Sequence, residues 1–317
     1  MNEQPSPLGT EQPSTNPNTP PLISIQTTPV ASFGTYSGGL QIPPKHSGLK
    51  VALFISGILA FIGILVALAF VVTKSVQKSQ QTQLTNTSVV IIGNSFTSRN
   101  QMPSSLLALL NTSRKTHYNL TTITNDGYSL HDHFGDSAEM DKFSQGLDGS
   151  KKWDVIILQE QSQTVGFDVT DTDHINSLAA VDYFAKAAST IGARLIIVNT
   201  WGYQSGDSTN RDIYPTYTAM QTRLNSGAEM LKTKVLAGYP QLQLVVSPVG
   251  TNWASLMTAG FSNELYASDG QHPSVFGSIL EAATIAKSID ETVNWDATSV
   301  MKGVSADQRK QIVSLVK

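Results

Sequence analysis

The sequence predicts a three-layer α/β/α sandwich with a mainly parallel five-stranded sheet, preceded by one transmembrane helix. Short apolar runs alternate with segments of helical periodicity over residues 88–317. Strands that are separated by helices usually lie parallel in one sheet, joined by right-handed crossovers. An uncharged apolar segment at 51–73 comes before them, and a polar tail comes before that segment. These three observations define four parts of the chain.

The first part, residues 1–49, is rich in Pro, Thr, Ser, Asn and Gln. It has few apolar side chains, and they follow neither a strand period nor a helical period. Such a segment cannot bury enough apolar surface to offset its chain entropy. We therefore expect a disordered tail.

The second part, residues 50–74, contains the uncharged run at 51–73, with a lysine at each end. At ~1.5 Å per residue this run reaches roughly 34 Å, which is enough to cross a hydrocarbon core of ~30 Å. The sequence thus predicts a lipid bilayer as partner and a single-pass protein of the cell membrane. Two nearby lysines on each side leave the orientation open by charge alone. We expect the domain after the span to be extracytoplasmic, because a single anchor near the amino terminus commonly exports the chain that comes after it.

Residues 75–87 form a polar stretch that is typical of a stalk. The remaining part, 88–317, has the length of one α/β domain. Its apolar runs and periodic segments predict the elements in order. Strands are expected at 89–92, 117–123, 153–158, 194–198 and 242–246. Helices are expected at 102–110, from a cap at Asp173 to Gly192, from about Thr216, from Pro273, and from a capping box formed by Ser305 and Gln308.

Composition excludes several functions. The net charge is −3, so no basic surface suggests nucleic acid as a partner. The chain has no cysteine, which rules out disulfides, thiol catalysis and cysteine-bound metal. We expect no cofactor and no metal.

The first candidate nucleophile is Ser95, just after the predicted strand at 89–92. Gly93 ends this apolar run, and Asn94 and Ser95 follow it directly. In open α/β sheets, ligands bind beyond the carboxyl ends of the strands. A serine there is well placed for catalysis, although an ordinary turn serine would give the same pattern.

A base for Ser95 is predicted near the end of the chain. His272 lies three residues after Asp269, within one short loop that Gly270 makes easy to close. The carboxylate can hold one ring nitrogen, which leaves the other free to take a hydroxyl proton. A turn aspartate beside a helix-capping histidine is the alternative interpretation.

Together, the segments Ile92-Gly-Asn-Ser-Phe96 and Asp269-Gly-Gln-His272 resemble the SGNH hydrolases, also called GDSL esterases or lipases. This resemblance covers roughly residues 88–288, and it implies a flavodoxin-like sheet with a Ser-His-Asp triad. Asn94 replaces the aspartate of the family's usual Gly-Asp-Ser loop. The resemblance makes Ser95 the nucleophile, His272 the base and Asp269 the residue that orients it.

The resemblance also implies three donors to a tetrahedral oxyanion. The first is the N–H of Ser95, and the second fits Gly127, which follows the second strand. The family's third donor is an asparagine in a Gly-x-Asn-Asp loop, which this chain lacks. A glutamine amide can donate equally well, so Gln159 is favoured and Gln161 is the second choice.

Other residues have weaker signals. Asn94 and Trp201 are expected to contact the substrate, although Trp201 suits the core equally well. His131 and His133 could share one face of an extended segment, but no third metal ligand is evident. Glu160 is either a partner of the site or a solvated charge at the end of a strand.

These residues predict a membrane-anchored serine ester hydrolase. Its expected substrate is a small acyl ester, such as an acetyl group on a carbohydrate or glycan. An acyltransferase would use the same site. A non-catalytic glycan-binding module is the other alternative, favoured by Asn94 and by the missing Gly-x-Asn-Asp loop.

Overall fold

The structure is a computed structural model that describes residues 59–70, 84–149 and 152–317. The chain divides into two units, residues 1–76 and 77–317. In the first unit, residues 59–70 form a helix whose side chains are exposed. Most of the predicted tail, transmembrane segment and stalk lies outside the described residues. Within the described residues, no helix is both long and apolar enough to cross a membrane.

In the second unit, five parallel strands form one sheet in the order β2-β1-β3-β4-β5. The order reverses at β1, because the chain first adds β2 on one side and then β3 to β5 on the other. The crevice beside such a reversal is where open α/β sheets bind ligands. The strands are β1 (Thr85–Gly93), β2 (Thr116–Thr124), β3 (Val155–Leu158), β4 (Arg194–Val198) and β5 (Leu244–Ser247).

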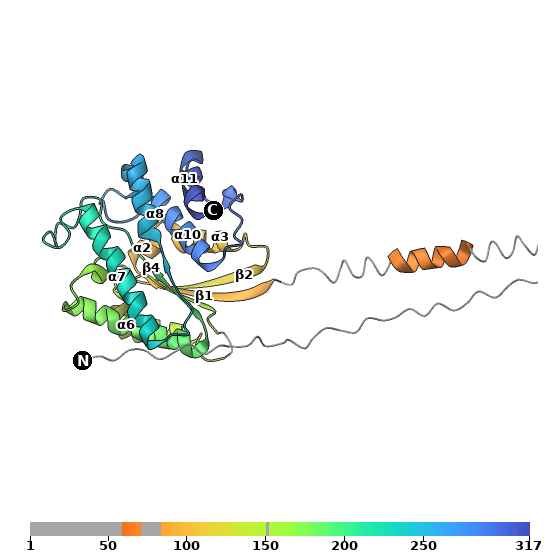
Figure 1. The fold of residues 1–317 in the computed structure, drawn as a ribbon, viewed down its shortest axis with the longest axis horizontal. Helices are drawn as coiled ribbons and strands as arrows, with labels where there is room; N and C mark the ends of the chain where they lie inside the picture. The colour runs from red at the N-terminus through yellow and green to blue at the C-terminus, as the bar shows by residue number, and fades with distance from the viewer. Residues whose placement is uncertain (1–58, 71–83, 150–151) are drawn as a thin grey trace, which may run out of the picture. The chain divides into compact units, whose positions relative to one another are not determined.

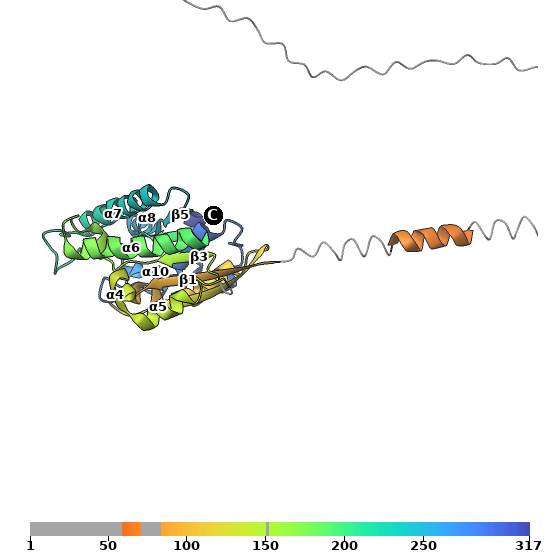
Figure 2. The same ribbon diagram turned by 90° about the horizontal axis from the view of Figure 1, so that it is seen from below.

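Helices cover both faces of the sheet, so the predicted three-layer α/β sandwich is confirmed (Figures 1 and 2). One layer contains α4, α5, α6 and α7, and the other contains α3, α8, α10 and α11. The helices are α2 (Ser95–Ser98), α3 (Met102–Leu110), α4 (Leu130–Gly135), α5 (Ser137–Ser144), α6 (Thr172–Ile191), α7 (Tyr217–Gly238), α8 (Val249–Leu256), α9 (Ser262–Leu265), α10 (Val275–Ile289) and α11 (Ala306–Val316).

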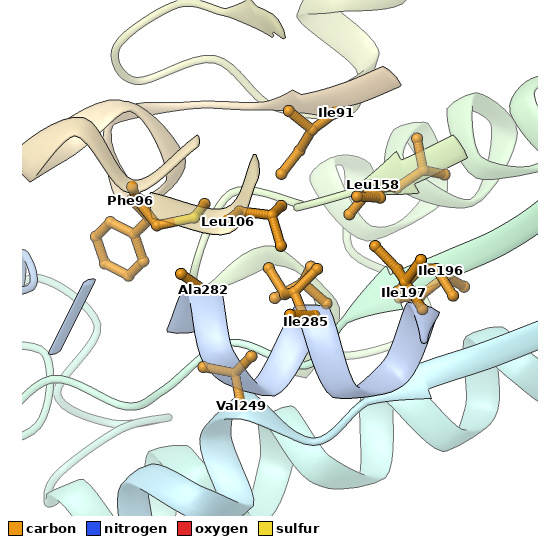
Figure 3. Packing of buried hydrophobic residues seen from close by; sticks show 14 of the residues in the cluster. Ile91, Phe96, Leu106, Leu158, Ile196, Ile197, Val249, Ala282 and Ile285 are labelled. Atoms are coloured by element: carbon orange, nitrogen blue, oxygen red, sulfur yellow. The ribbon is translucent and has the colours of Figure 1, made fainter. Parts of the chain in front are cut away.

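The core extends over both faces of the sheet, and one part of it lies where α10 packs against the strands. Ile91 and Ile196 on the strands and Ala282 and Ile285 on α10 are completely buried, and Figure 3 shows them within the packed cluster. The central strands are apolar on both faces, as expected of a parallel sheet between two helical layers. This packing holds the carboxyl ends of β1 and β3 in a fixed arrangement.

Several predicted boundaries were wrong. β1 begins at Thr85, so the end of the predicted stalk belongs to the sheet. Helix α6 begins at Thr172, because the Asp171 carboxylate, rather than Asp173, accepts the first helical N–H groups. Helix α10 begins after Pro273, with Ser274 as its cap. The helices α2, α4, α5, α8 and α9 were not predicted.

Candidate active site

Ser95 lies at the first position of α2, immediately beyond the end of β1. The side-chain oxygen of Asn94 caps this helix by accepting the N–H of Phe96 at 3.0 Å. The Asn94 amide donates to the carbonyl of Tyr128 at 2.9 Å, which ties the serine turn to the loop after β2. Asn94 is thus occupied within the protein and only 3% exposed, although it lines the cavity described below.

Gly93 allows this turn to form. A Cβ at this position would come within 2.6 Å of the Gln159 side-chain oxygen and 2.7 Å of the Thr97 hydroxyl. Real side chains do not approach this closely, so any larger residue at position 93 would displace the side chains of Gln159 and Thr97 beneath the turn.

The structure brings Ser95, His272 and Asp269 together in one hydrogen-bonded chain. The Oγ atom of Ser95 is 2.9 Å from Nε2 of His272. On the other side of the ring, Nδ1 is 2.6 Å from Oδ2 of Asp269. Ionised Asp269 can only accept, so Nδ1 carries the proton and Nε2 presents a lone pair to Ser95.

Asp269 also organises the loop that carries the histidine. Its Oδ1 atom accepts the backbone N–H groups of Gln271 at 2.9 Å and His272 at 3.0 Å. Partial burial alone would raise the pKa of Asp269, but these hydrogen bonds and the contact with His272 outweigh it. The pKa of Asp269 therefore lies below its usual value, and the carboxylate stays charged at neutral pH.

A cavity of about 370 Å³ opens beside Ser95; we call it the reaction cavity. Among the described residues, no acceptor takes the backbone N–H of Ser95 or of Gly127. Gly127 has a φ of +80°, a left-handed conformation that favours glycine. Both N–H groups are thus available to a ligand. The lining residues are Asn94, Ser95, Phe96, Arg99, Asp126, Gly127, Gln161, Ser162, Tyr203, Gln271 and His272.

Gln159 and Gln161, the two candidates for the third donor, differ in their surroundings. Gln159 is completely buried and does not line the reaction cavity. Its Oε1 accepts the N–H of Asn94 at 2.9 Å and the hydroxyl of Thr97 at 2.9 Å, while its amide donates to the Glu160 carbonyl. The expectation that Gln159 donates to the oxyanion was wrong, because Gln159 is completely buried outside the reaction cavity. Gln161 does line the cavity, and its amide contacts Gln163.

Trp201 is completely buried, so the expectation that it contacts the substrate was also wrong. It stacks between Phe96, at a centroid distance of 4.6 Å, and Trp253, at 4.2 Å. Its indole N–H donates to the carbonyl of Gln271 at 3.0 Å. Trp201 therefore packs against helix α2, which begins with Ser95, and also holds the loop that contains His272.

The two histidines considered as metal ligands lie on helix α4 rather than on an extended segment. His131 is exposed, whereas His133 is 1% exposed. The Nε2 of His133 contacts the carbonyl of Gly93 at 2.9 Å, and its Nδ1 contacts the carboxylate of Glu139. His133 thus serves the turn before Ser95, and the two rings do not converge on one ligand.

Two further polar residues belong to the site. Glu160 is 3% exposed, and burial raises its pKa although three hydrogen bonds oppose that shift. Tyr203 was not identified from the sequence; it lines the reaction cavity, and its hydroxyl lies 2.8 Å from that of Ser162. Its position shortly after the fourth strand was the only signal that could have indicated it.

No protein-family profile and no curated protein sequence matches this chain. Solved structures do. A candidate SGNH hydrolase from Slackia heliotrinireducens is 24% identical, with a TM-score of 0.50 over 65% of this chain and 100% of its own. A DUF4886 family protein from Bacteroides uniformis is 17% identical, with a TM-score of 0.49 over 73% of this chain and 93% of its own.

An acetylxylan esterase from Geobacillus stearothermophilus is 12% identical, with a TM-score of 0.46 over 68% of this chain and 97% of its own. At these identities the comparisons establish the fold alone, and the Slackia structure, with its TM-score of 0.50, is the basis for it. The described domain has the fold of the SGNH hydrolases, as the sequence predicted.

Proposed function

We propose that this chain, whose domain has the SGNH hydrolase fold, is a membrane-anchored serine ester hydrolase that removes small acyl groups, such as acetyl, from carbohydrate. One observation carries the proposal. Ser95 and His272 are 177 residues apart in the chain, yet their Oγ and Nε2 atoms lie 2.9 Å apart beside a cavity. The orienting carboxylate of Asp269 completes the arrangement that activates a serine.

The reaction proceeds in two halves. In the first, Nε2 of His272 takes the hydroxyl proton while Ser95 Oγ bonds to the acyl carbon. The oxyanion forms beside the N–H groups of Ser95 and Gly127 and the amide of Gln161, whose contact with Gln163 must yield to it. The intermediate collapses by breaking the bond to the alcohol oxygen, which receives the proton from His272.

In the second half, water replaces the alcohol. His272 takes one proton from this water as its oxygen bonds to the acyl carbon. The bond from that carbon to Ser95 Oγ then breaks, and His272 returns the proton to Oγ. The carboxylic acid leaves, and the enzyme regains its starting state.

A carbohydrate substrate is supported by a second, polar cavity of about 550 Å³ that shares Gly127 and Gln161 with the reaction cavity. Its walls carry amide, hydroxyl and carboxylate groups, which suit sugar hydroxyls. The half-buried ring of Phe167 adds an apolar surface. The reaction cavity itself, at about 370 Å³, suits a small acyl group.

Membrane anchoring rests on the uncharged segment 51–73. Its length suits one bilayer crossing. Protease accessibility of the domain in intact cells tests the proposed extracytoplasmic location, because an external domain would be cleaved without lysis.

The hydrolase proposal is tested with the full-length protein in detergent micelles. We expect hydrolysis of 4-nitrophenyl acetate by the unaltered protein and none above background by Ser95→Ala. Ser98→Ala is the matched control, because Ser98 lies on the same short helix and bonds Asp126 instead of the base. A fluorophosphonate probe should label Ser95 alone. Equal rates for the unaltered protein and Ser95→Ala would refute the proposal and favour a binding module.

A further inference from the structure

Glu160 connects three separate parts of the site through one buried carboxyl group. Its Oε1 atom accepts the backbone N–H of Gln161 at 2.7 Å and that of Leu130 at 2.9 Å. Its Oε2 atom accepts the hydroxyl of Ser177 at 2.6 Å. The side chain of Glu160 is almost inaccessible to solvent, so these protein groups replace the water that a carboxylate would otherwise bind.

The positions of these donors suggest what the carboxylate does. Leu130 is the first residue of α4 and comes shortly after the loop that contains Gly127. Gln161 lies in the loop after β3 and lines the reaction cavity. Ser177 is a buried residue of α6 and provides a fixed point outside both loops.

We propose that Glu160 is a positioning residue that holds Gly127 and Gln161 at the correct distance from Ser95 to stabilise the oxyanion. This inference rests on the proposed hydrolase function. Glu160 does not line the reaction cavity, so it acts through the backbone of its neighbours.

The residue before Glu160 completes the same arrangement. Gln159 accepts the N–H of Asn94, next to the nucleophile, and its amide donates to the backbone carbonyl of Glu160. Two consecutive residues directly after β3 thus hold opposite sides of the reaction cavity. Gln159 holds the turn at Asn94, and Glu160 holds the loops that contain Gly127 and Gln161. The distance between nucleophile and donors is then set by one short piece of backbone.

The chemistry of the three partners explains why an acid is suited to this position. Two N–H groups and one hydroxyl all donate, and an ionised carboxylate accepts only. Hydrogen bonds to an ionised group are also stronger than neutral ones. Alanine would leave the buried N–H of Leu130 and the partly buried N–H of Gln161 without acceptors, so both loops would have to shift.

The test compares Glu160→Ala and Glu160→Gln with the unaltered full-length protein on 4-nitrophenyl acetate. Losing an oxyanion donor costs about 10²–10³-fold in rate, and a displacement of about 1 Å can cost 10²-fold. We expect Glu160→Ala to lower kcat about 10–100-fold and to change KM less than about threefold. Binding of a trifluoromethyl ketone, which mimics the oxyanion, should weaken by a similar factor.

Glutamine keeps one oxygen for Leu130 and Gln161, and its amide can donate to the Ser177 hydroxyl. Glu160→Gln should therefore retain kcat within about fivefold. If Glu160→Ala does not fold, Glu160→Asp replaces it, because the shorter carboxylate cannot reach all three donors and should lower kcat about tenfold. Glu281→Gln is the control for altering a buried acid, since Glu281 on α10 makes no hydrogen bond with the described residues. It should leave kcat unchanged.

Three results would overturn the inference. The first is a folded Glu160→Ala or Glu160→Asp whose kcat stays within threefold of normal while Ser95→Ala is inactive; this result leaves the hydrolase proposal intact. The second is a loss confined to KM. The third is an unaltered protein that is no faster than Ser95→Ala, which would remove the hydrolase proposal and this inference together.

Discussion

Replacing Asp269 by asparagine tests the base without disturbing its loop. Asparagine keeps an oxygen that can accept the N–H groups of Gln271 and His272, at 2.9 and 3.0 Å, so the turn should persist. The new NH₂ group replaces the oxygen that lies 2.6 Å from Nδ1. This group can only donate, so it favours the ring tautomer with the proton on Nε2. That tautomer cannot accept the proton of Ser95.

The expected loss depends on the exposure of the pair. Two unit charges about 4 Å apart interact by about 1 kcal/mol in water and about 4 kcal/mol at an effective dielectric constant of 20. The side chains of His272 and Asp269 are 21% and 44% exposed, so about 2 kcal/mol is appropriate. This free energy corresponds to a loss of about 30-fold in kcat/KM. The ring tautomer with the proton on Nε2 raises the expected loss to about 10²-fold. The corresponding change in a serine protease with a buried aspartate costs about 10⁴.

The assay is kcat/KM for 4-nitrophenyl acetate at pH 7.5, with circular dichroism to verify the fold. Asp154→Asn is the control, because Asp154 precedes β3 at the opposite end of the strands and accepts the N–H of Ser88. It should keep normal activity. A folded Asp269→Asn protein that loses less than threefold would show that the carboxylate does not orient His272.

Three further predictions concern other parts of the site. Gln161→Ala should lower kcat about 10²–10³-fold with little change in KM, and a loss below tenfold would remove Gln161 from the oxyanion donors. Trp201→Ala should lower the free energy of unfolding in urea by about 3–5 kcal/mol, because Trp201 is completely buried, and a change below 1 kcal/mol would contradict this packing. The pKa of Asp269 is lowered by folding, so its ionised form contributes stability that is complete above about pH 4, where the unfolded group has also ionised. This contribution disappears as pH falls through the folded pKa. The stability difference between the unaltered protein and Asp269→Asn in urea should therefore vanish in acid, and a difference that persists unchanged at about pH 2 would refute the assignment.

The order of strands and helices could be predicted because buried parallel strands have continuous apolar runs. The run Val89–Ile92 is at most 1% exposed, and it was identified directly. The short helices α4 and α5 lacked such a signal, because their residues are mostly polar and their caps are local. Capping by Asp171 was missed for a similar reason: Asp171 and Asp173 are both plausible caps, and only the backbone geometry separates them.

At the site, sequence order placed Ser95 near His272 correctly, since residues beyond the carboxyl ends of parallel strands share one edge. It could not say which way a side chain turns. Gln159 and Gln161 differ by only two positions, yet one is buried under the serine turn and the other lines the cavity. Trp201 shows the same limit, because an aromatic residue after a strand suits a substrate surface and a core equally well. Its burial depends on stacking with Trp253, which is distant in sequence.

The two sides of the reaction cavity differ in exposure, and this difference bears on the choice between hydrolysis and acyl transfer. Behind the oxyanion donors, Glu160 is 3% exposed and accepts three hydrogen bonds. On the side of the base, His272 and Asp269 are partly exposed to solvent. The base side of the cavity therefore reaches solvent, and an acyl-enzyme is protected from hydrolysis only where water is excluded. We infer that the acyl group on Ser95 passes to water, so that added sugar alcohols should not compete measurably with the release of free acid.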